Sequence, residues 1–181
     1  MVVIRPTAKL RSLLPTVEVS VLSDTALGDW YVNRIVVARQ PLLLLVSSTS
    51  LLPIVTPAKD VRALPERLPT IVAARLRRTG IEPDVIAAEM GAMHPVMVAP
   101  TADRSVLGIM VDFAKAVTYY DGNLRTEEGL FALEDWLAET PCHAASINDR
   151  VVFPERKAPD LLRATWQRQN PPSARGAGVV H

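Results

Sequence analysis

The chain has 181 residues, of which 49% are hydrophobic and 22% charged, as in a soluble globular domain with a sizeable apolar core. Its formal net charge of +1 gives no global attraction to nucleic acid or to an anionic membrane surface. The single cysteine, Cys142, excludes an internal disulfide and any metal site built on paired cysteines.

The first residues carry the pattern of a folded domain and not that of a signal peptide. MVVIRPTAKLRSLLP has a charge at Arg5 and only a short apolar run. The most apolar window, residues 41–55, is interrupted by the polar run SSTS and is too short to span a bilayer. We therefore expect a cytoplasmic protein without a membrane partner.

Strand patterns dominate the first half of the chain. Residues 28–39 are rich in aromatic and β-branched side chains, and the next apolar run predicts the second strand of an antiparallel hairpin. That run, Leu42–Val46, shows no alternation, which predicts a central strand covered on both faces. Residues 51–56 are also expected to be extended. The predicted strands are 2–5, 28–39, 42–47 and 95–99.

Helical patterns dominate the second half. Pro69 and Pro83 stand at the first turn of helical stretches, and Gly80 and Gly91 follow their ends. The predicted helices are 7–14, 69–79, 83–90, 103–120 and 126–139. This order predicts an α+β fold with a small, mostly antiparallel sheet. We expect a single domain over residues 1–153 and a poorly ordered basic tail over residues 154–181.

The helix predicted at 103–120 is nearly all apolar but carries one narrow polar seam. At about 100° per residue, the seam covers roughly a third of the circumference. Its members are Arg104, Ser105, Gly108, Asp112, Lys115 and Tyr119. We expect a buried helix whose seam charges are paired or face a cleft, because unpaired buried charges are costly.

Within this seam, Arg104 and Asp112 lie about 12 Å apart along the axis, so each needs another partner or a ligand. Asp103 is expected to be the N-cap. Gly108 costs about 1 kcal/mol relative to alanine inside a helix. Close packing of the helix against a strand, or room for a ligand, would explain a glycine at this position.

The start of the 28–39 strand supplies a second group of candidates. Asn33 is unusual in a β-rich run and predicts a hydrogen bond, to a neighbouring loop or to a ligand. An ion pair between Asp29 and Arg104 would remove both from catalysis. The ligand- or partner-binding candidates are therefore Asp29, Trp30, Asn33, Arg104, Ser105, Gly108 and Asp112.

Other reactive residue types form no site pattern. Cys142 and His143 are adjacent, with no third group to activate a nucleophile. The histidines have no ligand spacing, so we expect no metal and no cofactor. Arg75, Arg77 and Arg78, with the basic tail, offer weak support for nucleic-acid binding, because charges at a helix end also complement the helix dipole.

Several segments together resemble an uncharacterised bacterial family, a domain of unknown function. They are VVIRPTAKL, LGDWYVN, LLPIV and TADRSVLGIMVDFA, within about residues 1–145. The family carries an LGDWYxN-like strand and a TxNRSVLGxMND-like helix. Asp103 and Val111 depart from it where the family has asparagine, which narrows the seam. The resemblance implies no activity.

Two hypotheses for function follow. The lack of a nucleophile–base pair favours a small accessory protein, not an enzyme, that binds a partner protein or a second copy of itself. The alternative is an enzyme acting on a phosphate-containing or nucleic-acid substrate. Arg104 would then hold the anion, Asp112 would act as base or magnesium ligand, and Asn33 would orient the substrate. That alternative requires these side chains, or Asp29 in place of Asn33, to converge on an open pocket.

Overall fold

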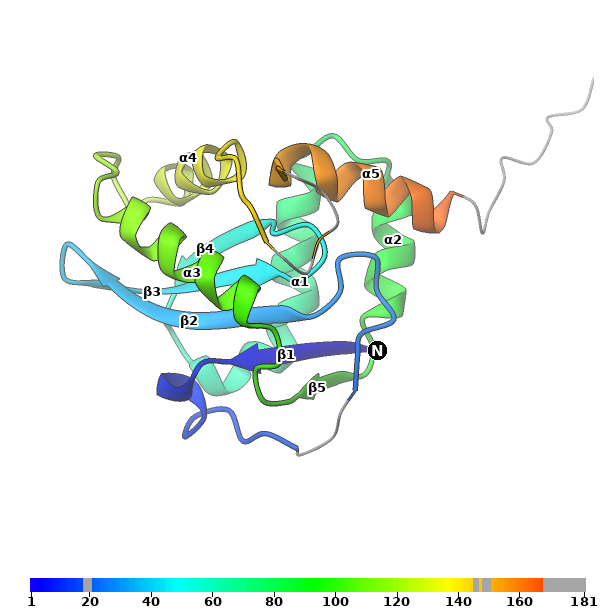
Figure 1. Ribbon diagram of the computed structural model, residues 1–181, viewed down its shortest axis with the longest axis horizontal. Helices are drawn as coiled ribbons and strands as arrows, with labels where there is room; N and C mark the ends of the chain where they lie inside the picture. The colour runs from blue at the N-terminus through cyan, green and yellow to red at the C-terminus, as the bar shows by residue number, and fades with distance from the viewer. Residues whose placement is uncertain (18–20, 145–146, 148–150, 168–181) are drawn as a thin grey trace, which may run out of the picture.

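A mixed five-stranded sheet lies at the centre of the structure, a computed structural model that describes residues 1–17, 21–144, 147 and 151–167 (Figure 1). The strand order is β4-β3-β2-β1-β5. The strands are β1 (Val2–Pro6), β2 (Trp30–Val37), β3 (Gln40–Ser47), β4 (Pro53–Pro57) and β5 (Val96–Val98). β2, β3 and β4 are antiparallel, which confirms the predicted hairpin, whereas β1 is parallel to both β2 and β5.

Helices cover both faces of this sheet, which gives a single α+β domain. The helices are α1 (Leu64–Arg77), α2 (Pro83–Ala92), α3 (Arg104–Val117), α4 (Glu127–Ala138) and α5 (Pro154–Trp166), with 3₁₀ helices η1 (Ala8–Leu10) and η2 (Val61–Ala63). Side chains of α1, α2 and α5 pack on one face, and those of α3 and α4 pack on the other.

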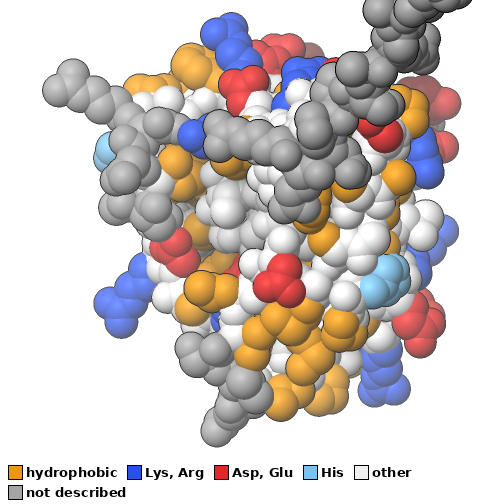
Figure 2. Space-filling view, turned by 90° about the vertical axis from the view of Figure 1, so that its right-hand side faces the viewer, with side chains coloured by type: hydrophobic (Ala, Val, Ile, Leu, Met, Phe, Trp, Pro, Cys, Tyr) orange, Lys and Arg blue, Asp and Glu red, His pale blue; other side chains and the backbone are white. Residues whose placement is uncertain are grey.

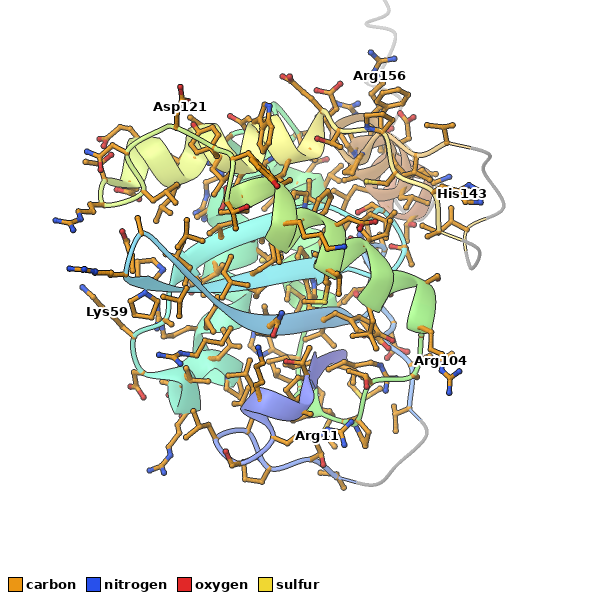
Figure 3. The ribbon with its side chains drawn as sticks, turned by 60° about the vertical axis from the view of Figure 1, so that its left-hand side comes forward. Arg11, Lys59, Arg104, Asp121, His143 and Arg156 are labelled. Carbon is orange, nitrogen blue, oxygen red and sulfur yellow. The ribbon has the colours of Figure 1, made fainter. Side chains whose placement is uncertain are left out.

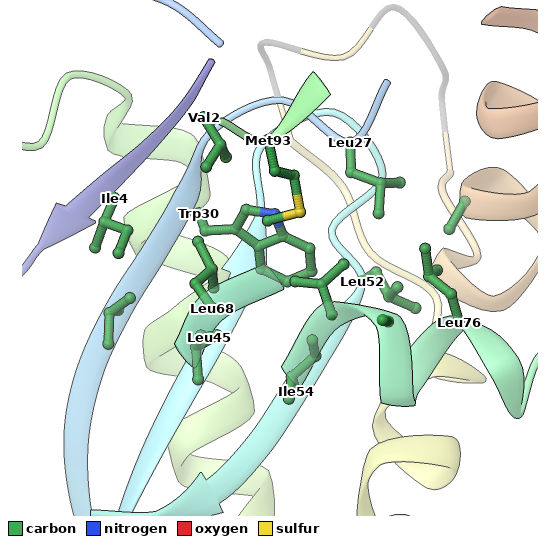
Figure 4. Packing of buried hydrophobic residues seen from close by; sticks show 14 of the residues in the cluster. Val2, Ile4, Leu27, Trp30, Leu45, Leu52, Ile54, Leu68, Leu76 and Met93 are labelled. Atoms are coloured by element: carbon green, nitrogen blue, oxygen red, sulfur yellow. The ribbon is translucent and has the colours of Figure 1, made fainter. Parts of the chain in front are cut away.

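The unbroken apolar run in β3 divides its side chains between the two faces, as predicted. Leu43 and Leu45 join the cluster under α1, while Leu42 and Leu44 join the cluster under α3 and α4. Trp30 is fully buried in the first cluster, where Met93 and Leu68 lie around its ring (Figure 4). β3 is therefore a central strand that has no solvent-facing side.

Two predicted helices have different bounds. The helix expected at 7–14 is only the 3₁₀ turn η1, because the Thr7 hydroxyl donates to Asn33 Oδ1 at 3.0 Å and makes no capping bond. The helix expected at 69–79 begins at Leu64, with Pro65 in its first turn and Pro69 inside it. The other three predicted helices are present, with shifts of at most three residues at their ends.

The poorly ordered tail that the sequence predicts from residue 154 does not begin there. Residues 154–166 form α5, which packs on the core through Ala158 and Leu162. Helix α5 lies against α2, where Arg163 Nε pairs with Glu82 Oε2 at 3.1 Å. The predicted domain boundary at 153 therefore falls before the last helix of the fold. Residues 168–181, with Arg168 and Arg175, lie outside the described residues.

A buried carboxylate on α2 ties α5 to the rest of the core. Glu89 is 1% exposed and accepts the N–H groups of Ala26 at 2.9 Å and Leu27 at 3.0 Å. It also accepts the indole N–H of Trp166 at 2.7 Å. Burial raises the pKa of Glu89 above its usual value. One side chain thus joins α2, α5 and the loop before β2.

We predict that Glu89→Ala lowers the free energy of unfolding by about 3 kcal/mol, because three buried donors lose their acceptor. Chemical denaturation of the full chain measures this loss. The matched control is Glu82→Ala, which breaks the solvent-accessible ion pair between the same two helices and is expected to cost far less. Equal losses in the two variants would contradict the role assigned to Glu89.

Candidate functional site

The first residues of α3 are fixed from two sides. Asp103 is the N-cap, as predicted: its carboxylate accepts the N–H groups of Ser105 at 2.8 Å and Val106 at 3.4 Å. From β2, the Tyr31 hydroxyl oxygen accepts the N–H groups of Asp103 at 2.8 Å and Ala102 at 3.3 Å. The approach to α3 is therefore held against the sheet by a side chain that is 1% exposed.

Asp29 pairs with Arg5 of β1, so the ion pair with Arg104 that the sequence allowed is not formed. Arg5 is 4% exposed and also donates to the carbonyl oxygens of Pro100 at 2.5 Å and Val21 at 2.7 Å. The other carboxylate oxygen of Asp29 accepts the Ser23 hydroxyl at 2.6 Å. Asp29 is thus a buried carboxylate held by an ion pair and by the Ser23 hydroxyl.

Gly28 brings the loop before β2 close to the loop after β3. Its φ of +69° lies in the left-handed region, and an added Cβ would stand 2.4 Å from Ser48 Oγ. This approach lets Ser48 Oγ accept the N–H of Asp29 at 2.9 Å. A side chain at position 28 would therefore displace Ser48.

These groups surround an open depression of about 810 Å³ at the start of α3, hereafter the α3 depression. It is lined by Leu22, Asp29, Tyr31, Ser48, Ala102, Asp103, Arg104 and Ser105. Arg104 projects from the first turn of α3 (Figure 3) and has no ion pair or hydrogen bond with any residue that the structure describes. Three of the seven predicted site residues meet here: Asp29, Arg104 and Ser105.

The buried hydroxyl of Tyr31 and the half-buried hydroxyl of Ser48 give the α3 depression hydrogen-bond donors as well as a charge. The oxygens of Tyr31 and Ser48 accept backbone N–H groups, and no described residue accepts the hydroxyl protons. Burial raises the pKa of Tyr31, so its hydroxyl keeps the proton at neutral pH. The sequence analysis missed both residues, although Tyr31 lies inside the LGDWYVN segment.

The rest of the predicted seam does not reach the α3 depression. Helix α3 is buried on one face only, and Gly108, Val111 and Asp112 are exposed. An added Cβ at Gly108 would meet nothing within 4 Å, so close packing does not explain this glycine. The helix is amphipathic rather than buried all round.

Asp112, Asn33 and Trp30 are each placed elsewhere. Asp112 faces Cys142, whose pKa is raised to about 11 by burial and then by this carboxylate. Asn33 accepts a hydrogen bond from Thr7, and Trp30 is inside the core. The enzyme hypothesis requires Arg104, Asp112 and Asn33 to converge on one pocket. The structure does not bring these three side chains together.

Two of the three arginines at the end of α1, Arg75 and Arg78, hold α4, whereas Arg77 is exposed. Arg75 is 3% exposed; its Nη1 donates to Asp135 at 2.6 Å, and its Nε lies 3.7 Å from Glu134 Oε2. Arg78 also pairs with Glu134 and lies over the Phe131 ring, 3.8 Å from its centroid. Figure 2 shows basic and acidic side chains interspersed around one face of the molecule, with no field of a single charge. Arg75 and Arg78 are thus unavailable for nucleic acid.

Among the residues with described positions, no three His, Cys, Asp or Glu side chains are grouped to hold a metal ion. Within the same ranges, no helix has the length and apolar character needed to cross a bilayer.

Glu134 makes the stability of the fold depend on pH. Burial raises its pKa from 4.5 to about 7, although Val55 N–H and two arginines oppose the rise. Between these values the folded protein holds a proton that the unfolded chain has lost. We predict that the free energy of unfolding falls by about 3 kcal/mol from this group as the pH rises through that range. Above about pH 7 the contribution of Glu134 stays constant.

Urea denaturation of wild type and Glu134→Gln at pH 4.5 and 7.5 measures this effect. The glutamine cannot titrate, so the stability difference between the two proteins should change with pH in the stated direction. Glu139→Gln, at the exposed end of the same helix, is the control. A difference that is the same at both pH values would contradict the prediction.

Comparison with known proteins places the chain in a family without assigning a function. No curated protein and no solved structure matches it. The sequence pattern of a domain of unknown function, DUF6933, matches residues 3–157, which include the sheet, α1 to α4 and the start of α5. The chain belongs to this family of domains of unknown function.

Proposed function

We propose that this protein binds, without transforming it, a ligand that carries a phosphate or carboxylate group, and that the ligand occupies the α3 depression. The observation that carries this proposal is the set of unused donors there: the Arg104 guanidinium and the hydroxyl protons of Tyr31 and Ser48. A guanidinium with neutral hydroxyls supplies charge-assisted and ordinary hydrogen bonds to anionic oxygens.

The two carboxylates beside the α3 depression are both already engaged by groups of the protein. Asp29 is neutralised by Arg5, and the Asp103 carboxylate accepts N–H groups of its own helix. Arg104 therefore has the side chain best placed to attract an ion from solvent. A volume of about 810 Å³ falls in the range of ligand sites for small molecules.

Binding fits this arrangement better than catalysis. The carboxylate that the enzyme hypothesis needs, Asp112, lies toward Cys142, and Asp29 is held in a buried ion pair. A general base must reach the proton it removes within hydrogen-bond distance. Neither group meets that condition at the α3 depression, which supports the binding hypothesis.

Isothermal titration calorimetry with three probes tests the proposal: inorganic phosphate, adenosine monophosphate and citrate. We expect at least one probe to bind the wild-type chain, and Arg104→Met to weaken that binding by about 10- to 100-fold, the range for a hydrogen bond to a charged group. Lys115→Met removes an exposed charge from the same helix and is the matched control, expected to leave affinity nearly unchanged.

Two results would contradict the proposal. If none of the probes binds the wild type, the donor set does not make an anion site. If Arg104→Met and Lys115→Met weaken binding equally, the attraction is general electrostatics and not recognition at the α3 depression. Ser48→Ala adds a separate check, because it removes a neutral donor and is expected to weaken binding by several-fold at unchanged net charge.

A further inference from the structure

Strand β2 extends beyond the strand beside it. β1 pairs with β2 only as far as Pro6 opposite Val32, whereas β3 pairs with β2 to Val37. After Pro6 the chain turns into η1. Residues 33–37 therefore have a neighbour on one side, and among the described residues no strand lies on the other.

The backbone of this segment is aimed at the empty position. The Val32 carbonyl accepts the N–H of Thr7 at 2.9 Å, so the backbone N–H and C=O groups of Val32 are directed toward β1. Pro41, opposite Val36, turns its carbonyl toward β4, where Ala58 N–H donates at 3.0 Å. By alternation along the strand, Arg34 and Val36 direct their N–H and C=O groups outward. No described residue bonds to those four groups.

A groove of about 590 Å³ follows this free edge, hereafter the β2 groove. It is lined by Lys9, Asn33, Arg34, Ile35, Val36 and Ala114. Helix α3 and η1 both contact β2 and lie on opposite sides of it (Figure 3). The β2 groove thus lies beside the open edge of β2, with helix α3 as one wall.

The two walls differ in chemistry. Ala114 is the α3 residue that lines the β2 groove, and Leu107 and Val111 stand next to it on the same face of the helix by helical spacing; Val111 is 50% exposed. On the other wall, Lys9 and Arg34 are exposed and form no ion pair with a residue of the described chain. One wall is therefore apolar and the other is basic.

We propose that the β2 groove receives an extended segment of a partner protein as a sixth strand, with acidic residues alternating with apolar ones. Successive side chains of a strand point to opposite faces of a sheet. Apolar side chains of the segment would then lie against α3, and acidic ones against Lys9 and Arg34. The outward N–H and C=O groups of β2 supply the backbone hydrogen bonds of strand addition.

Charge argues against the two other occupants. A second copy would bring Lys9, Arg34 and Arg39 of both chains together, and like charges across a strand pair are destabilising. The chain's own residues after 167 include Arg168 and Arg175 and no acidic residue. An acidic segment from another protein is the occupant that the basic wall favours.

Fluorescence anisotropy with a labelled nine-residue peptide that alternates Glu with Val tests the proposal on the full chain. We expect saturable binding that weakens with added salt. A peptide of the same sequence with N-methyl groups on alternate amides should bind at least tenfold more weakly, because it cannot complete the ladder. Hydrogen exchange at the amides of Arg34 and Val36 should slow when the unmethylated peptide is bound.

Variants separate the edge from general charge. Arg34→Glu should reduce affinity at least tenfold, while Arg77→Glu, an equal charge change at the exposed end of α1, should leave it nearly unchanged. Val36→Pro removes one outward N–H, and Val36→Ala keeps it, so only the proline should abolish binding. Arg104→Met, which tests the α3 depression, should have no effect on peptide affinity.

Three results would overturn the proposal. Equal binding of the methylated and unmethylated peptides would exclude strand addition. Equal losses in Arg34→Glu and Arg77→Glu would reduce the basic wall to general electrostatics. Sedimentation of the wild type as a dimer that Val36→Pro dissociates would assign the edge to a second copy of this chain.

Discussion

The buried ion pair between Arg5 and Asp29 fixes the geometry on which the α3 depression depends. Charges removed from water are tolerated only when they are paired and hydrogen-bonded, and here both conditions are met. The Arg5 guanidinium reaches from β1 to Asp29, just before β2, and to the carbonyl oxygens of Val21 and Pro100. One side chain thus joins β1, β2, the loop between them and the segment that leads into α3. Asp29 of this pair and the buried Tyr31 are part of the wall of the α3 depression, so that part of its shape is set by the core.

The second constraint is the unequal length of two neighbouring strands. β1 ends at Pro6, and the next amide, that of Thr7, bonds the Val32 carbonyl before the chain turns into η1. Leu10 of η1 is fully buried, and its burial in the core favours a chain direction that leaves the sheet after Pro6. The edge of β2 beyond Val32 is left open for that reason. Exposed edges invite pairing between copies, and charged side chains such as Arg34 oppose it. The same charge selects for an acidic partner.

Much of the fold could be predicted because its sequence signals are local. The site was harder to predict because its contacts join residues that are far apart in the sequence. The apolar run in β3 and the N-cap at Asp103 follow from a few adjacent residues, and both predictions are confirmed. The partner of Asp29 is 24 residues away on another strand, and no local pattern indicates it. The sequence predicts that helix α3 is buried, yet its apolar residue Val111 is exposed. Hydrophobicity alone does not determine which apolar residues are buried. Glu134 left a usable signal, since it lies between Leu130 and Leu137 on the apolar face of a predicted helix.

The α3 depression and the β2 groove share one rigid strand, and this bears on how they interact. Tyr31 lines the first and Arg34 the second, three positions apart on β2. Every residue of β2 is in register with β3, whose side chains are buried on both faces. Coupling between two sites requires an element with two arrangements that both ligands bias. Side chains of β2 also lie in both hydrophobic clusters, so a second arrangement of this strand would break core contacts. The ligand and the added strand are therefore expected to bind independently, with affinities that do not depend on each other, and the two surfaces act as separate recognition sites on one scaffold.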